Sequence, residues 1–207
     1  MKTFVIDHPL IKNKLTIVRN KHTDSKTFRE TINEIAGLMS YEATKDLEVT
    51  TIDIETPLAH TKGEALKNPI VIVPILRAGL GMSDAIHMLI PNAKVGHIGL
   101  YRDETTFEPA EYYAKFPSEM KDATVLLLDP MLATGGSVIK AYNIVKSHGA
   151  DDVRYIGVVA SPEGVDAIEK ACPDMKNYIA SIDDGLTDTK YITPGLGDAG
   201  DRLFGTK

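Results

Sequence analysis

The sequence predicts an α/β fold with an open, mostly parallel central sheet that has helices on both faces. Continuous apolar runs, at residues 70–73 and 125–128, are typical of parallel strands that are buried on both sides. Amphipathic segments with helical spacing alternate with such runs along the chain. At residues 129–137 an acidic residue and a loop of small residues follow a strand, which marks the carboxyl edge of the sheet as the ligand-binding edge.

The composition predicts a single domain over residues 1–207. Apolar residues make up 43% of the chain and charged residues 25%, as in ordinary globular proteins. The net charge of −6 gives no overall attraction to nucleic acid or to an anionic membrane. No apolar stretch approaches the roughly 18 residues that span a membrane, and we expect no signal peptide. The only cysteine, Cys172, predicts a buried structural thiol in a reducing, cytoplasmic setting.

The first third of the chain predicts packing elements. Basic residues cluster within residues 1–26, but apolar residues interleave with them, which favours an ordered amphipathic segment over a nucleic-acid-binding arm. Apolar residues then recur at helical intervals over residues 28–47 and predict one long helix. Residues 49–54 alternate in polarity and predict a strand. Two roles stay open for this helix and strand: a hood over the site, or a dimer face.

An arginine follows the first buried strand, at residues 70–73. We expect Pro74 to end this strand, because proline removes a donor from the sheet. Arg77 comes next, among alanine and glycine residues, before a helix that starts near Met82. An arginine at the carboxyl end of a strand is well placed to bind pyrophosphate through its planar fork. A surface arginine in a turn is the alternative.

Residues 101–117, after a strand at 95–101, are polar and aromatic and contain two prolines. A long segment of this kind inside a compact domain is usually functional and often a lid. Its acidic residues Glu104, Glu108 and Glu111 are expected to keep an open lid soluble, in preference to a catalytic or metal-binding role.

The loop after the second apolar run predicts a site for a sugar phosphate. Its small residues at 133–137 let the backbone approach a bound group, and the N–H groups at the start of the following helix favour a phosphate. Asp129 would repel phosphate, so its carboxylate is expected to accept hydrogen bonds from neutral hydroxyls such as those of a ribose. A tight turn in which Asp129 only caps the helix is the alternative. A P-loop is excluded because no lysine follows the glycines, and a dinucleotide fingerprint is absent.

The last third continues the alternation with a strand at 153–160, a helix at 163–171 and a strand at 178–182. Residues 191–205 contain so much glycine and proline that we expect neither helix nor strand there. Their glycines free the main chain to present N–H and C=O groups to a flat ligand. A flat ligand with complementary donors and acceptors would pair with these groups, whereas a mismatched one would leave groups of the site unpaired. A structural tail is the alternative.

Several stretches carry a resemblance to a known family, including residues 69–80 and 101–117 described above. LLLDPMLATGGS, at residues 126–137, resembles the phosphoribosyl-pyrophosphate (PRPP) loop of type I phosphoribosyltransferases. Most of those enzymes have two adjacent acids there, and the replacement of the second acid by Pro130 is similar to the uracil phosphoribosyltransferases. HPLIKNKLT at residues 8–16 and PGLGDAGDR at residues 194–202 also resemble segments of the uracil family. The resemblance covers essentially the whole chain.

The resemblance implies the type I phosphoribosyltransferase fold with a small hood and a flexible β-hairpin lid. It implies catalytic roles for Arg77, Arg102 and Asp198. The implied uracil-binding residues are Ile192, Gly197, Asp198 and Ala199. The implied PRPP-binding residues are Arg77, Arg102, Asp129, Pro130, Met131, Leu132, Ala133, Thr134, Gly135, Gly136, Ser137 and Asp198.

The implied reaction transfers the phosphoribosyl group of PRPP to N1 of uracil and gives UMP and pyrophosphate, a step of pyrimidine salvage. Mg²⁺ is implied as cofactor, bound through PRPP oxygens and water without a dedicated protein site. A homodimer or larger homo-oligomer and a GTP effector are also implied, and no nucleic acid or membrane partner is. Either Asp198 or a water molecule accepts the proton from N1. The alternatives are a purine phosphoribosyltransferase and an RNA-binding regulator on the same fold.

Overall fold

The computed structural model describes residues 2–102 and 109–206, without the side chain of Arg102. Its centre is a nine-stranded sheet with the strand order β1-β11-β10-β8-β4-β6-β7, in which β5 pairs with β4 and β9 with β10. Every pairing is parallel except that of β6 with β7. The strands are β1 Thr3–Val5, β4 Ile70–Leu76, β5 Lys94–Val95, β6 His97–Arg102, β7 Pro109–Lys115, β8 Thr124–Leu128, β9 Met131–Leu132, β10 Asp152–Ala160 and β11 Lys176–Ile182. The mostly parallel α/β fold predicted from the sequence is confirmed.

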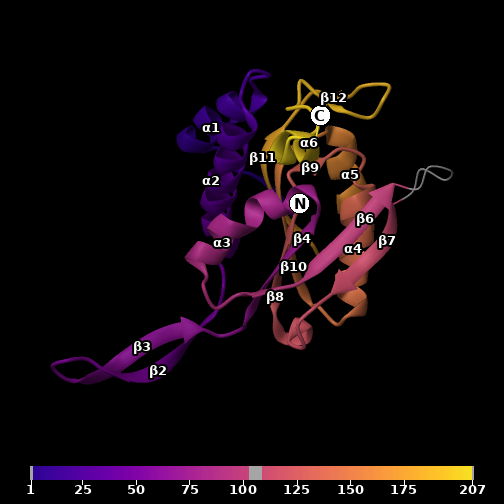
Figure 1. Ribbon diagram of the computed structural model, residues 1–207. Coiled ribbons are helices and arrows are strands. Elements are labelled where there is room, and N and C mark those ends of the chain that lie inside the picture. The colour runs from indigo at the N-terminus through magenta and orange to yellow at the C-terminus, as the bar shows by residue number, and fades with distance from the viewer. Residues whose placement is uncertain (1, 103–108, 207) are drawn as a thin grey trace.

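Helices cover both faces of this sheet (Figure 1). One face packs against α1 (Pro9–Arg19), α2 (Ser25–Thr44), α3 (Ser83–Leu89) and α6 (Ala199–Phe204). The other packs against α4 (Gly136–Ser147) and α5 (Pro162–Ala171). Two short 3₁₀ helices, η1 (Ala78–Met82) and η2 (Met120–Asp122), lie in connections. No helix in the described ranges is long and apolar enough to cross a membrane.

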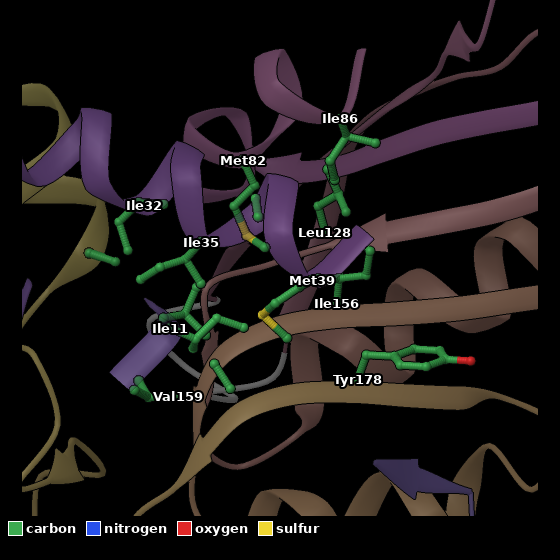
Figure 2. Close-up of a cluster of buried hydrophobic side chains, with 14 of the residues drawn as sticks. Ile11, Ile32, Ile35, Met39, Met82, Ile86, Leu128, Ile156, Val159 and Tyr178 are labelled. Atoms are coloured by element: carbon green, nitrogen blue, oxygen red, sulfur yellow. The ribbon is translucent and has the colours of Figure 1, made fainter. Parts of the chain in front are cut away.

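The two hydrophobic cores follow from the alternation of side chains along each strand. In β8, Leu126 and Leu128 belong to the core beneath α1 and α2, whereas Val125 and Leu127 belong to the core beneath α4 and α5. Figure 2 shows the first core, where side chains of α1 and α2 meet strand residues such as Leu128. Cys172 is buried in the second core, as expected.

Two small antiparallel pairs lie outside the central sheet. Strands β2 (Val49–Glu55) and β3 (His60–Leu66) form an arm that projects from the body (Figure 1). All seven residues of β2 are exposed. Strands β12 (Gly185–Leu186) and β13 (Ile192–Thr193) form a second pair, which we call the hood. Of residues 25–54, α2 packs on the sheet and β2 belongs to the arm.

Two expectations about secondary structure were wrong. Pro74 does not end its strand, because β4 continues to Leu76. Pro74 lies on the same edge as Ile72, whose carbonyl accepts from the Gly96 N–H. Gly96 separates β5 from β6, so the neighbouring strand is interrupted next to Pro74. The N–H that proline lacks is therefore not needed for a regular strand pairing there.

Residues 191–205 are also not free of regular structure. They contain β13 and the six-residue helix α6. The helix forms because the proline and two of the glycines precede it, and because the Asp198 side chain accepts a hydrogen bond from the Asp201 N–H at 2.9 Å and caps its start.

Candidate active site

The loop at residues 129–137 leaves the carboxyl end of β8 and is held against β10. Its short strand β9 pairs with the end of β10, Met131 opposite Val159 and Leu132 opposite Ala160. The Pro130 carbonyl accepts from the N–H groups of Val158 and Val159. Pro130 and Leu132 are both buried, and Leu132 belongs to the second core.

The other side of the loop is fixed by α5. The Ser161 hydroxyl donates to the Ala133 carbonyl at 2.6 Å, and its oxygen accepts from the Gly164 N–H at 2.9 Å, which caps the helix. The loop backbone is thus held in place before any ligand binds, as a site that recognises its ligand through main-chain groups requires.

The start of α4 supplies a group of N–H donors. Gly135 precedes the helix with φ of +82°, a conformation that costs other residues strain. The N–H groups of residues 134–137 have no hydrogen-bond partner among the described residues. The side chains of Thr134 and Ser137 are exposed and add two hydroxyls. Together with the helix dipole, these donors form a site suited to a phosphate group.

Asp129 lies at the end of β8 beside this group of donors, and its side chain is half-buried. Its Oδ1 accepts from the Met131 N–H at 3.3 Å. Burial raises the pKa of Asp129 to about 7, although the N–H of Met131 acts in the opposite direction. A carboxylate with so few donors around it is suited to accept hydrogen bonds from the hydroxyls of a ligand.

The main chain at Asp129 is held by a residue that sequence reasoning missed. Tyr155 of β10 is fully buried and donates from its hydroxyl to the Asp129 carbonyl at 2.8 Å.

We expect Tyr155→Phe to lower the free energy of unfolding by about 1–2 kcal/mol, because it leaves a buried carbonyl without its donor. Urea unfolding at neutral pH measures this. An unchanged midpoint would contradict the assigned hydrogen bond.

Arg77 follows β4 through a cis peptide bond with Leu76. Its Nη2 lies 3.5 Å from Oδ1 of Asp201, and its guanidinium carbon lies 5.9 Å from the ring centroid of Phe204. Half of the Arg77 side chain is exposed to solvent. The arginine thus lies beside the start of α6, with part of its fork directed to solvent and open to an anionic ligand.

The predicted lid contains regular structure. Strands β6 and β7 form an antiparallel hairpin, in which Arg102 is paired with Pro109. Glu111 is exposed on β7. The side chain of Arg102 and the residues Glu104 and Glu108 lie outside the described part of the structure.

The segment at residues 192–200 lies across the carboxyl edge of the sheet from the loop at residues 129–137. Ile192 and Ala199 are buried, whereas Gly197 and Asp198 are exposed. The segment is joined to the end of β11, because the Asp184 N–H donates to the Thr193 carbonyl at 3.0 Å.

The predicted phosphate loop and the predicted base segment share one pocket of about 250 Å³. Asp129, Met131 and Ala133 line one part of it. Ile192 and the segment from Gly197 to Gly200 line another, and Ala78, Lys190 and Tyr191 complete the lining. The structure therefore brings together residues that the sequence separates by about sixty positions, which allows one ligand to contact both.

Sequence reasoning missed several residues around this pocket. Lys190 and Tyr191 lie between the two strands of the hood and precede the glycine-rich segment. Asp183 and Arg19 form an ion pair beside the glycine-rich segment. A signal for Asp183 was present, because two aspartates and a glycine follow β11 at the ligand-binding edge of the sheet. No local pattern distinguishes Arg19 from the other basic residues near the N-terminus.

Over residues 2–102 and 109–206, no three His, Cys, Asp or Glu side chains group closely enough to hold a metal ion.

Comparison with known proteins identifies the family of this chain. The family model described as uracil phosphoribosyltransferase matches residues 5–206. The chain is 55% identical over 206 residues to a uracil phosphoribosyltransferase of Acholeplasma laidlawii, covering 100% of this chain and 99% of the relative. It is 52% identical over 207 residues to one of Anoxybacillus flavithermus, covering 100% and 99%.

Solved structures give the same result for the fold. A protein of Aquifex aeolicus, 37% identical, superimposes with a TM-score of 0.94 over 99% of both chains. An adenine phosphoribosyltransferase of Trypanosoma brucei, in complex with AMP, pyrophosphate and ribose-5-phosphate, is only 16% identical. It superimposes with a TM-score of 0.61 over 95% of this chain and 88% of its own.

Proposed function

The chain belongs to the uracil phosphoribosyltransferase family, which transfers the phosphoribosyl group of PRPP to N1 of uracil. From this premise we propose which residues bind each part of the substrates. The products are UMP and pyrophosphate. The observation that carries the assignment is the pocket in which Asp129 and Ala133 lie opposite the segment from Gly197 to Gly200. The N–H donors of residues 134–137 follow directly after Ala133 on one side of it, and the segment on the other side offers main-chain groups for a base.

We assign the 5-phosphate and ribose of PRPP to residues 129–137. The N–H groups and hydroxyls of residues 134–137 bind the phosphate, and the Asp129 carboxylate accepts from the ribose hydroxyls. Met131 and Ala133 line the pocket, whereas Pro130 and Leu132 act through the backbone that they hold in the sheet. All nine residues of the loop thus serve the ligand, but only some of them contact it.

We assign uracil to Ile192, Gly197, Asp198 and Ala199. Ile192, Gly197 and Ala199 have no polar side-chain atoms, so their main-chain groups supply any polar contacts that they make in this part of the pocket. A fixed pattern of main-chain donors and acceptors pairs with the two carbonyls and the N3–H of uracil. Asp198 also faces PRPP, and either its carboxylate or a water molecule takes the proton from N1.

We assign the departing pyrophosphate to Arg77 and Arg102. Breaking the bond between C1 of the ribose and the pyrophosphate oxygen leaves positive charge on the sugar and negative charge on pyrophosphate. An arginine fork stabilises this developing anion more than it stabilises the ground state. Arg77 already lies beside Gly200, since a Cβ on Gly200 would be 3.5 Å from Nη2 of Arg77. Arg102, at the end of β6, would join from the hairpin.

We propose that Mg²⁺ enters with PRPP, because the described carboxylates do not cluster into a site of their own. When bound, the ion neutralises charge on the pyrophosphate oxygens. The protein then contributes the orientation of PRPP through residues 129–137 and the binding of the leaving group through Arg77.

We propose a homodimer in which the arm formed by β2 and β3 packs on a second copy. A hairpin of two strands is marginally stable alone, and this one exposes Val49, Ile52, Ile54 and Leu58 to solvent. Sedimentation should then give about twice the chain mass of 22.6 kDa.

The proposed GTP effector is tested by adding GTP to the activity assay. The buried, lone Cys172 fits the proposed cytoplasmic location.

Pyrophosphate release from PRPP, with each base offered separately, tests the proposed activity. We expect release with uracil and at least about 100-fold less with cytosine, hypoxanthine or adenine, because a mismatched base leaves polar groups of the site unpaired. Release with hypoxanthine or adenine alone would favour a purine enzyme. No release with any base, together with salt-dependent binding of RNA, would favour the regulator.

A further inference from the structure

An ion pair outside the pocket holds the segment assigned to uracil. Arg19, the last residue of α1, donates from Nη1 and Nη2 to the two carboxylate oxygens of Asp183, at 2.7 and 2.6 Å. The same Nη1 donates to the Gly195 carbonyl at 2.8 Å. Asp183 in turn accepts from the Gly195 N–H at 2.9 Å. One ion pair therefore binds both polar main-chain groups of Gly195.

Gly195 depends on this support because its backbone is unusual. It has φ of +60°, and a Cβ at this position would lie 2.1 Å from the Ile192 carbonyl oxygen. The residue belongs to no helix or strand. Its peptide orientation is set by side chains from α1 and from the end of β11, and Gly197 and Ala199 follow two and four residues later.

The Asp183 carboxylate is itself firmly placed. Its side chain is 2% exposed, and the Ser181 hydroxyl donates to it at 2.9 Å. Although burial opposes ionisation, hydrogen bonds from Arg19 and Ser181 and the N–H of Gly195 keep the pKa of Asp183 below its ordinary value. The ion pair is therefore intact at neutral pH.

A second arginine holds the next residue. Arg202 of α6 donates to the Leu196 carbonyl at 2.7 Å, and its guanidinium carbon lies 4.1 Å from the ring centroid of Phe28. It also donates to the Asn20 carbonyl at 2.7 Å, just after α1. Both arginines thus connect the end of α1 to the residues that immediately precede Gly197.

Resting on the proposed uracil site, we propose that Arg19 and Asp183 are positioning residues that set the affinity for uracil without touching it. A site made of main-chain groups cannot adjust by side-chain rotation, so its hydrogen bonds require the peptide planes to be in place. A misplacement of about 1 Å in such a site can cost about 100-fold in activity. Arg19 and Asp183 hold the Gly195 peptide plane, from which the base segment continues.

A matched control lies at the opposite, amino end of β10. Arg154 is 4% exposed in its side chain and donates to the carboxylate of Asp152 at 2.9 Å and to the carbonyl of Ala43 at 2.6 Å. It also pairs with the carboxylate of Asp46. This arginine therefore holds carboxylates and a carbonyl, as Arg19 holds Asp183 and the Gly195 carbonyl, but it does not line the pocket. Arg154→Lys reports the effect of weakening a buried ion pair on stability alone.

The experiment compares Asp183→Asn, Arg19→Lys and Arg154→Lys in the full chain. We expect Asp183→Asn to raise KM for uracil by about 10–100-fold, with KM for PRPP changed by less than about threefold. Arg19→Lys should shift KM for uracil in the same direction. Arg154→Lys should lower the melting temperature and leave the ratio of the two KM values unchanged.

Hydrogen exchange over residues 192–198 provides a readout that does not need activity. We expect exchange at least about tenfold faster in Asp183→Asn and Arg19→Lys, and unchanged in Arg154→Lys. If exchange were unchanged, or if both KM values rose equally, the positioning role would be wrong. A wild-type protein that uses no uracil would overturn the proposed function, whereas faster exchange in the two variants would still support the positioning of the segment.

Discussion

Asp129→Asn is expected to lower kcat/KM for PRPP by about 100-fold or more while raising the melting temperature at pH 8. The activity falls because a neutral amide is a weaker acceptor for the two ribose hydroxyls than a carboxylate is. Asparagine keeps an oxygen for the Met131 N–H, so the local backbone is retained. The measurement is a PRPP titration at saturating uracil.

The stability gain follows from the pKa of the same group. The folded pKa of Asp129 is about 7 and its ordinary value is 3.8, so above pH 7 the folded protein carries a carboxylate that burial disfavours. Asparagine removes this cost, which we put at about 1–3 kcal/mol because the pocket is open to water on one side. For a chain of this length that is roughly 2–10 °C in melting temperature.

The sign of this effect depends on pH. The advantage of asparagine should be full above about pH 7 and should shrink as the pH falls, since aspartate then becomes neutral in the folded protein as well. Below pH 3.8 it should vanish. Melting curves at pH 8 and pH 4 measure this. A lower melting temperature for the variant at pH 8, or a gain that grows as the pH falls, would contradict the account of Asp129.

Arg77→Ala is expected to lower kcat/KM for PRPP by about 100–1,000-fold and to leave the affinity for UMP within about threefold. The loss follows from removing a fork that stabilises the leaving pyrophosphate. UMP carries no pyrophosphate, so its binding should not depend on this arginine. Kinetics with PRPP and calorimetry with UMP provide the two numbers.

Arg77→Lys is the matched variant, because it keeps the charge and loses the planar fork. We expect its activity to lie between those of wild type and Arg77→Ala. Asp129→Asn provides the opposite control, since UMP retains the ribose hydroxyls and should bind more weakly to that variant. If Arg77→Ala weakened UMP and PRPP equally, Arg77 would serve the shared part of the ligands and not pyrophosphate.

The sequence predicts the strands well where both faces are buried. The apolar run that precedes Asp129 corresponds to β8, and the run that precedes Arg77 corresponds to β4. The pattern is strong there because every position has a neighbour in one of two cores. The same two runs end at the carboxyl edge of the sheet, so the sequence predicts Asp129 and Arg77 as site residues.

The parts that the sequence did not predict depend on distant partners. Pro74 is tolerated because the neighbouring strand is interrupted at Gly96, and no local pattern shows this. Tyr155 looks like any buried strand residue, and only the fold brings its hydroxyl to the Asp129 carbonyl. Arg19 lies 164 positions from Asp183. Contacts of this kind are fixed by topology and leave no periodicity in the sequence.

A crystal structure of the protein with UMP tests the central claim most directly. The account predicts the phosphate against the N–H groups of residues 134–137, the ribose hydroxyls on the Asp129 carboxylate, and the pyrimidine against Gly197 and Ala199. A phosphate bound away from the start of α4, or a pyrimidine out of contact with residues 192–199, would contradict it.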